Sequence, residues 1–292
     1  MKILCGTDFT AGADAAVEAA RAIAARTGGT LRLVHVSDRG DATAADAPGA
    51  VDASLQPRLE AVAARLAHDG VAPEVAVVRG NPDEAIDADA KRIGADLIAV
   101  GALGRRARSA WRLGSTADRI AQQAPCAVLV VRAAEPFSAW ARGDRPLRIV
   151  VGIDGTPTSE PALRWLARLA ASGPCTLIGA HVYWPPEARE RLKLSGPIPI
   201  GKDHPEVDAA IERDLRERIG AVIGNAKIEL RTVGGLGRVA DHLVEIAAEE
   251  RADLIAVGSQ QRSGFDRLWH GSISRGVIDA APENVLCVPS RC

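Results

Sequence analysis

The sequence lacks an excess of charge of either sign. Its 292 residues carry 36 Lys and Arg against 37 Asp and Glu, a formal net charge of -1. There is no basic stripe of the kind that holds a nucleic-acid backbone, and no block of like charges that would indicate a disordered tail. We therefore expect no nucleic-acid partner.

Long apolar runs are also missing. No stretch approaches the roughly 20 apolar residues that a transmembrane helix needs. The N-terminus enters a strand-like run at Lys2, without a leader pattern. The five cysteines form no C-x-x-C pair, and Cys5 and Cys287 stand in apolar runs, where cysteine acts as a small hydrophobic residue. We expect no membrane contact and a reduced, cytoplasmic setting.

What the sequence does contain is an internal repeat. The heptapeptide Ala-Asp-Leu-Ile-Ala-Val-Gly at Ala95–Gly101 returns unchanged at Ala252–Gly258, which is 157 residues later. Nearer the start, Lys2–Asp8 matches Arg148–Asp154 at an offset of 146. The second copy therefore carries 11 additional residues (157 − 146) between these two segments.

The repeat predicts two domains. Its copies are each close to the usual size of a domain, and the chain is 47% hydrophobic, enough for two cores. We predict domains at residues 1–133 and 146–292, joined by a linker from Ala133 to Pro146. The additional residues of the second copy are expected in the Pro-rich stretch Pro185–Pro205.

Short apolar runs alternate with helical patterns in each copy. The runs are nearly continuous in Val, Ile, Leu and Ala, which is typical of strands buried on both faces. In the first copy the predicted strands are Lys2–Gly6, Leu31–Val36, Glu74–Val78, Leu97–Gly101 and Ala127–Val131. The predicted helices between them are Asp14–Arg26, Leu55–Ala67, Pro82–Arg92 and Ser115–Gln123. The alternation predicts an α/β fold of two tandem doubly wound, Rossmann-like domains, each a five-stranded parallel sheet flanked by helices.

A glycine-spaced turn follows the fourth predicted strand. Gly101 and Gly104 precede, after nine further residues, Gly114-Ser115-Thr116 at the start of a helix. Glycine lets a ligand approach the backbone closely, and a helix start offers free N–H groups and the positive end of its dipole. These features predict a phosphate site. The alternative is that the glycines only turn the chain and Ser115 is an ordinary N-cap.

With this turn, the repeat and the strand order, the chain resembles the universal stress protein family. That family's nucleotide signature is Gly, two residues, Gly, nine residues, Gly, then Ser or Thr, and the first copy matches it in full. Thr7-Asp8-Phe9 and His35-Val36 are also similar to the family. The resemblance covers both copies nearly end to end. It implies an adenine nucleotide alpha-hydrolase-like fold that binds an adenine nucleotide, ATP in many members.

The resemblance also implies roles for individual residues. Asp8 and Val36, with Gly6 at the end of the first strand, would line the adenosine. The residues expected around ribose and phosphates are Gly101, Gly104, Gly114, Ser115 and Thr116. Mg²⁺ would be held mostly by phosphate oxygens of the bound ATP, ADP or AMP. The corresponding residues of the second copy are Asp154, Val182, Gly258, Gly271 and Ser272.

The second copy departs from the signature at one position. Gln261 stands where Gly104 stands in the first copy. A side chain there would fill space that the ligand needs or forbid the required backbone angle. We therefore predict a weaker or altered site in the second domain.

Three functions fit this pattern. The first is a cytoplasmic stress-response regulator that binds an adenine nucleotide, with domains paired through their final strands within the chain or in a homodimer. The second is a slow ATP hydrolase, in which Asp8 is the obvious candidate to position water. The third is a ligand-free scaffold or interaction protein. ATP turnover abolished by Asp8→Ala with binding retained would favour the second, and no thermal shift with ATP and Mg²⁺ the third.

Other signals have simpler interpretations. Gly196–Asp203 nearly spells a P-loop but ends in Asp where Ser or Thr should bind Mg²⁺. Gly235–Ala240 resembles a dinucleotide fingerprint, yet it follows the third predicted strand, so a tight turn is favoured. His35 and His181 occupy equivalent apolar strands and are expected to be buried and hydrogen-bonded rather than catalytic.

Overall fold

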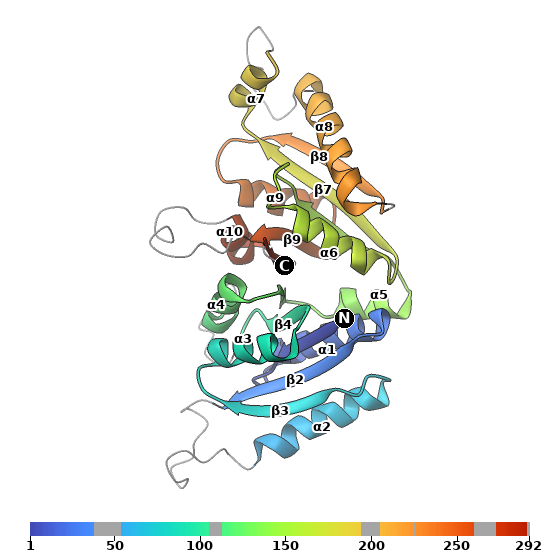
Figure 1. Cartoon of the computed structure of the whole chain (residues 1–292), viewed down its shortest axis with the longest axis vertical. Coiled ribbons are helices and arrows are strands. Elements are labelled where there is room, and N and C mark those ends of the chain that lie inside the picture. Colours follow the sequence, from blue (N-terminus) through green and yellow to red (C-terminus); the bar gives the residue numbers. More distant parts are fainter. Residues whose placement is uncertain (38–53, 105–112, 194–204, 225, 260–272, 291–292) are drawn as a thin grey trace. The chain divides into compact units, whose positions relative to one another are not determined.

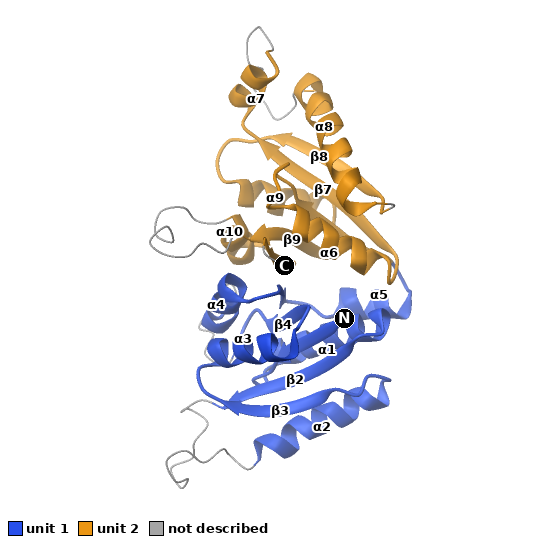
Figure 2. Cartoon of the chain, viewed as in Figure 1, with its two compact units in different colours: residues 1–145, 292 blue, residues 146–291 orange. Residues whose placement is uncertain are grey.

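The computed structural model describes residues 1–37, 54–104, 113–193, 205–224, 226–259 and 273–290 (Figure 1). The chain forms two compact units, residues 1–145 (unit 1) and residues 146–291 (unit 2), coloured separately in Figure 2. Each unit is an α/β structure with a parallel sheet, which confirms the predicted fold class. No helix within the described ranges is long and apolar enough to cross a membrane.

Unit 1 contains all the strands and helices predicted for the first copy. Its strands are β1 (Lys2–Gly6), β2 (Thr30–Ser37), β3 (Glu74–Arg79), β4 (Leu97–Gly101) and β5 (Ala127–Val131). Its helices are α1 (Ala11–Thr27), α2 (Leu55–His68), α3 (Pro82–Ile93), α4 (Ser115–Gln123) and α5 (Glu135–Arg142). The strands are parallel in the order β3-β2-β1-β4-β5. The order reverses between β1 and β4, where such sheets form a ligand crevice.

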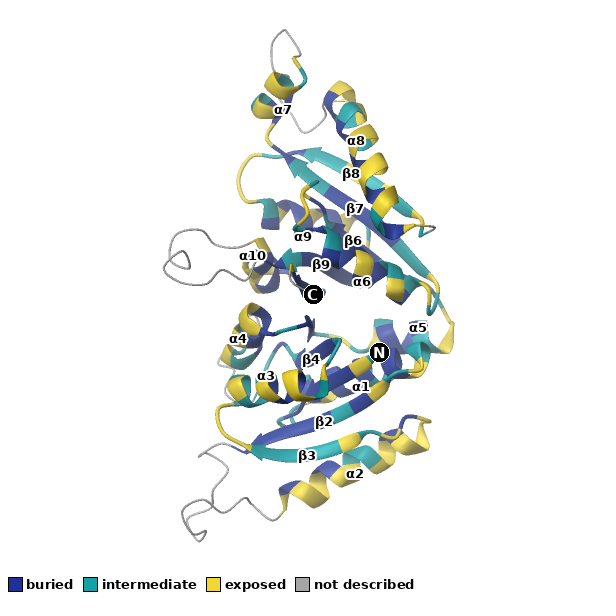
Figure 3. Ribbon diagram, viewed as in Figure 1, coloured by how far each residue is buried: buried dark blue, intermediate teal, exposed yellow. Residues whose placement is uncertain are grey.

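The apolar runs explain the burial of the sheet. Every residue of β5 is buried, as is every residue of β4 except Gly101. Figure 3 shows exposed residues mainly on the outward faces of the helices. Helix α1 begins where the Thr10 hydroxyl accepts a hydrogen bond from Ala13 N and ends at Gly28, whose φ of 59° suits glycine.

Helix α5 occupies the segment that we predicted as a linker. Glu135–Arg142 packs against α1, and Phe137 and Trp140 are fully buried. Pro136 lies in the first turn, where its missing N–H costs nothing, and Gly143 ends the helix at a φ of 84°. The compact unit 1 therefore extends beyond residue 133, and the segment predicted as a linker contains a packed helix.

Unit 2 repeats the strand order of unit 1. Its strands are β6 (Leu147–Gly152), β7 (Cys175–Tyr183), β8 (Ile228–Gly234), β9 (Leu254–Ser259) and β10 (Asn284–Pro289), parallel in the order β10-β9-β6-β7-β8. Its helices are α6 (Glu160–Ala170), α7 (Pro185–Arg191), α8 (Pro205–Ile223), α9 (Val239–Glu249) and α10 (Ile273–Ala280). Helix α7 lies in the Pro-rich stretch to which the sequence assigns the additional residues.

The core of unit 1 contains an ion pair between β2 and α3. Arg32 Nε donates to Asp89 Oδ2 at 2.7 Å, and the two side chains are only 11% and 7% exposed. Burial raises the pKa of Asp89, but hydrogen bonds from Arg32 and Arg92 outweigh it and hold that pKa below its ordinary value. In unit 2 the repeat offsets place Ile178 and Ile246 at these positions, and both are buried.

Candidate functional site

The turn after β1 fixes the Asp8 carboxylate. The Thr10 hydroxyl donates to Asp8 Oδ1 at 2.6 Å, and Thr10 N donates to the same oxygen at 3.1 Å. The other oxygen, Oδ2, lies beside Gly104, since a Cβ added at Gly104 would be 2.9 Å from it. The carboxylate is thus held against the turn that follows β4.

Gly104 and Gly114 meet beside that carboxylate. Gly114 N donates to Ala102 O at 2.8 Å, and a Cβ added at Gly114 would lie 3.6 Å from Gly104 N. Gly114 is the N-cap of α4 and supplies no side-chain hydrogen bond. The N–H groups of the first turn, including those of Ser115 and Thr116, therefore have no partner within the helix. The site combines a carboxylate, a stretch of bare backbone and a helix start.

Two other predicted site glycines are explained by packing. A Cβ at Gly101 would lie 2.5 Å from Gly12 O, because the first turn of α1 rests directly on the end of β4. A Cβ at Gly6 would lie 2.7 Å from Ile86 Cδ1 of α3. Close contacts within unit 1 account for both glycines, and their contact with a nucleotide stays a prediction.

An aromatic cluster beside Asp8 was not anticipated from the sequence. Phe9 has a φ of 60°, a left-handed conformation that costs a residue with a side chain about 1–2 kcal/mol. Its ring stacks on His35 with centroids 4.7 Å apart, and the Arg58 guanidinium lies 4.2 Å from the ring centroid. His35 is fully buried, and its Nδ1 lies 2.8 Å from Thr7 O. Val36, predicted to line the adenosine, is buried next to His35 near the end of β2.

Unit 2 repeats the turn after β6 with different side chains. Asp154 Oδ1 accepts a hydrogen bond from Thr156 N at 2.9 Å. Gly155 stands at the position of Phe9 and shares its left-handed conformation, with a φ of 71°. A Cβ at Gly258 would lie 2.5 Å from Thr158 O, which repeats the contact between Gly101 and α1. The two units therefore build their strand ends with the same backbone.

Comparisons with known proteins agree with this geometry. The profile of the universal stress protein family matches residues 1–132 and 147–289. The chain belongs to that family.

Individual relatives extend the comparison. Universal stress protein Rv2005c of Mycobacterium tuberculosis is 30% identical over 193 residues, which cover 66% of this chain and 61% of that protein. The match thus spans only about three fifths of the length of this relative. A universal stress protein of Archaeoglobus fulgidus shares the fold, with a TM-score of 0.75, 18% identity and coverage of 100% of this chain and 98% of that one. A universal stress protein solved in complex with cAMP is 30% identical, with a TM-score of 0.37 and coverage of 50% of this chain and 98% of that one.

Only some of the predicted site residues of the second universal stress protein domain lie among the described residues. Val182 lies near the end of β7, and its Cγ1 would be 2.8 Å from a Cβ added at Gly235. The predicted phosphate-turn residues of this domain, Gly271 and Ser272, lie outside the described residues, as does Gln261. The near-P-loop Gly196–Asp203 also lies outside the described residues.

The motif at Gly235–Ala240 forms a turn, as expected. Gly235 N donates to Tyr183 O at 2.9 Å, and Gly237 has a φ of 100°. His242 Nε2 lies 3.0 Å from Leu236 O, so α9 also holds the turn. These contacts give every glycine of the motif's first half a role in turning or packing the chain.

His181 differs from its counterpart in burial. It is half-buried, and its Nδ1 lies 2.7 Å from Ile153 O. Burial is the main cause that lowers the pKa of His181, whereas the hydrogen bond to Ile153 opposes this shift and the charge of Arg191 adds to it. The absence of a ring at Gly155 explains why His181 is less covered than His35.

Proposed function

We propose that unit 1 binds ATP or a related adenine nucleotide across the ends of β1 and β4. The observation that supports this proposal is the meeting of Asp8, Gly104 and the uncapped start of α4. Phosphate oxygens placed at the helix start would accept its N–H groups and meet the positive end of its dipole. A side chain at Gly104 would intrude on this space.

In this proposal different residues contact the adenosine part and the phosphates of the nucleotide. We assign Asp8 to the adenosine part, from which its carboxylate accepts a hydrogen bond. Beside the phosphates the same carboxylate would repel the ligand. The amides of Ser115 and Thr116 bind the phosphates, and the bare backbone at Gly104 leaves room for the ribose beside Asp8. Mg²⁺ is held chiefly by phosphate oxygens and water, in keeping with its preference for oxygen ligands.

We infer that nucleotide binding regulates the protein rather than serving catalysis. A ligand that binds one arrangement of the surrounding loops better than another shifts the protein toward it. Such a response would report the nucleotide level of the cytoplasm during stress. Unit 2 would bind the nucleotide more weakly, since Gln261 replaces the glycine of the signature.

Calorimetric titration of the full chain with ATP and Mg²⁺ tests the proposal. The wild type should bind one ATP per chain tightly, with any binding to unit 2 weaker. Gly114→Asp places a carboxylate where the phosphate belongs, so we expect a loss of about 2 kcal/mol, or about 30-fold in Kd. Gly220→Asp is the matched control, because Gly220 is exposed on α8 with no atom within 4 Å of an added Cβ.

The controls decide between site and general charge effects. Equal losses in Gly114→Asp and Gly220→Asp would show that the added charge acts from anywhere on the chain. Unchanged binding in Gly114→Asp would remove the site from the start of α4. No heat and no thermal shift in the wild type would reject nucleotide binding altogether.

A further inference from the structure

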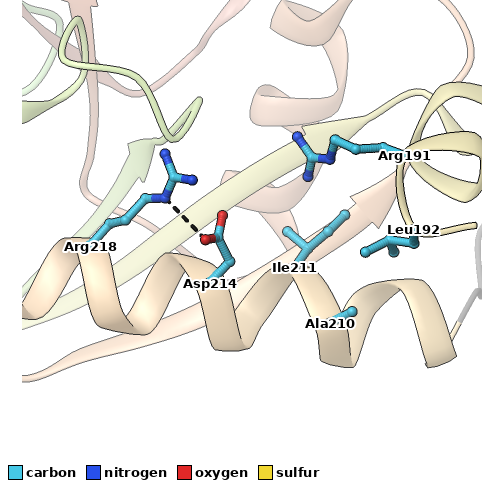
Figure 4. A pocket seen from close by; sticks show the side chains of 6 residues that line it. All are labelled: Arg191, Leu192, Ala210, Ile211, Asp214 and Arg218. Atoms are coloured by element: carbon cyan, nitrogen blue, oxygen red, sulfur yellow. Dashed lines mark hydrogen bonds and ion pairs between the residues drawn. The ribbon is translucent and has the colours of Figure 1, made fainter.

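A cavity of about 320 Å³ opens between α7 and α8 of unit 2 (Figure 4). Two of its lining residues, Arg191 and Leu192, come from the end of α7. The others are on α8: Ala210, Ile211, Asp214 and Arg218. Its size lies at the lower end of the range for small-molecule sites, roughly 300–1,000 Å³.

The two arginines of this cavity differ in their partners. Arg218 Nε donates to Asp214 Oδ1 at 3.1 Å, and its Nη1 donates to Gly155 O at 3.1 Å. Arg191 forms no side-chain hydrogen bond or ion pair with any residue in the part of the chain that the structure describes. Figure 4 shows it reaching from the end of α7 over the cavity toward Ile211. Among the described residues, no carboxylate pairs with this guanidinium, which makes it a candidate partner for an anion.

The charges and apolar atoms of the lining restrict the ligand. The arginines and Asp214 together leave one net positive charge. A monoanion would neutralise that net charge, whereas a dianion would leave one net negative charge in the cavity. Leu192 and Ile211 supply apolar surface, which favours a ligand with an apolar part beside its charged group.

The cavity also lies beside the ends of β6 and β7. Arg218 reaches Gly155, which follows β6, and the charges of Arg191 and Asp214 act on His181 of β7. In unit 1 the corresponding histidine is covered by the Phe9 ring. Gly155 has no ring, so unit 2 presents a different surface at this place.

We propose that this cavity binds a small organic carboxylate. Arg191 pairs with the carboxylate in the bidentate manner that a guanidinium allows. Ile211 and Leu192 contact the apolar part of the ligand. This site is separate from the nucleotide site of unit 1, and its existence does not depend on that one.

Titration of the full chain with hexanoate, followed by ligand-detected NMR, tests the proposal. The wild type should bind hexanoate, and Arg191→Gln should weaken binding at least about tenfold, since it removes the anion's partner. Ala210→Leu should weaken binding similarly by filling the cavity without changing charge. Arg213→Gln is the matched control, because Arg213 is an exposed arginine of α8 that does not line the cavity; it should bind like the wild type.

Three results would overturn the proposal. The first is the absence of hexanoate binding by the wild type. The second is an equal loss in Arg191→Gln and Arg213→Gln, which would indicate general charge attraction. The third is displacement of hexanoate by AMP or inorganic phosphate at equal concentration, which would assign the cavity to phosphate ligands instead.

Discussion

Units 1 and 2 use the same backbone at their strand ends and fill it differently. Phe9 and Gly155 share a left-handed φ, yet Phe9 carries a ring that contacts His35 and Arg58, whereas Gly155 carries none. Arg218 binds the Gly155 carbonyl instead. The comparison teaches that the fold requires the turn, while the side chains around it determine which surface a ligand meets.

A second difference lies deeper in the two units. The same two core positions hold the ion pair Arg32–Asp89 in unit 1 and the isoleucines Ile178 and Ile246 in unit 2. A buried ion pair is often replaceable by apolar residues of similar volume, because the attraction between the charges is offset by their loss of hydration. The two units present both solutions within one chain.

Breaking the ion pair on one side should have the largest effect. Asp89→Ile leaves the buried Arg32 charge without its main partner, so we expect a loss of about 3–5 kcal/mol in the stability of unit 1. Glu74 also pairs with Arg32, but it is 70% exposed and is a poor substitute. Denaturant titration monitored by hydrogen exchange in β2 would measure the loss in unit 1 alone.

The double change Arg32→Ile with Asp89→Ile is the matching control. It copies the solution of unit 2 and should recover most of the lost stability. A double variant as unstable as Asp89→Ile would show that the surroundings of the pair in unit 1 cannot accept apolar residues.

A smaller effect is expected from Gly101 and Gly258, which contact the backbone within or just before the first helix of their units. Gly101→Ala and Gly258→Ala would each place a methyl group 2.5 Å from a backbone carbonyl oxygen. We expect each unit to lose about 1–3 kcal/mol through overpacking. Gly220→Ala on α8 has open space around it and should be neutral or slightly stabilising. Clearly unequal losses in the two units would contradict the shared backbone.

The left-handed turn can be tested by two changes at a single residue. Phe9→Ala and Phe9→Gly both remove the ring from His35 and Arg58, so both lose its packing. Phe9→Gly should be more stable than Phe9→Ala by about 1 kcal/mol, because glycine adopts this conformation without strain. Equal stabilities of the two variants in thermal unfolding would show that the backbone at Phe9 is not strained.

The smallest expected effect concerns pH. The pKa of His181 is lowered in the folded state, so the unfolded chain takes up a proton first as pH falls. Unit 2 should therefore lose stability as pH falls below about 6.5, the ordinary histidine value. His181→Gln should show a shallower decline than the wild type in this range. An identical pH dependence of the two proteins would remove His181 as its source.

The fold was predictable because its signals are local. The apolar runs gave the correct bounds of β1, β4 and β5, and Gly114-Ser115 marked the start of α4. Helix α5 was missed because Pro136, Gly143 and Pro146 resemble the composition of a linker. Pro136 and Gly143 also suit the first turn and the end of a short helix. The burial of Trp140 shows that the helix is the correct interpretation.

The position of the candidate site was predictable, but the side-chain contacts around it were not. Glycine spacing indicated the turn after β4, and the repeat indicated its counterpart. The stacking of Arg58 on Phe9 joins residues 49 positions apart (58 − 9), which no local pattern encodes. The only sequence signal was Gly155, whose tolerance of a left-handed φ marks the conformation that Phe9 also adopts.

Helix α5 determines where the first half of this protein can be separated from the second. A gene fragment that stops after β5 would remove Phe137 and Trp140 and leave bare the apolar surface of α1 that they cover. Such a fragment would be prone to aggregate during expression even if its sheet were intact. The cut belongs after Arg145, where the compact unit ends.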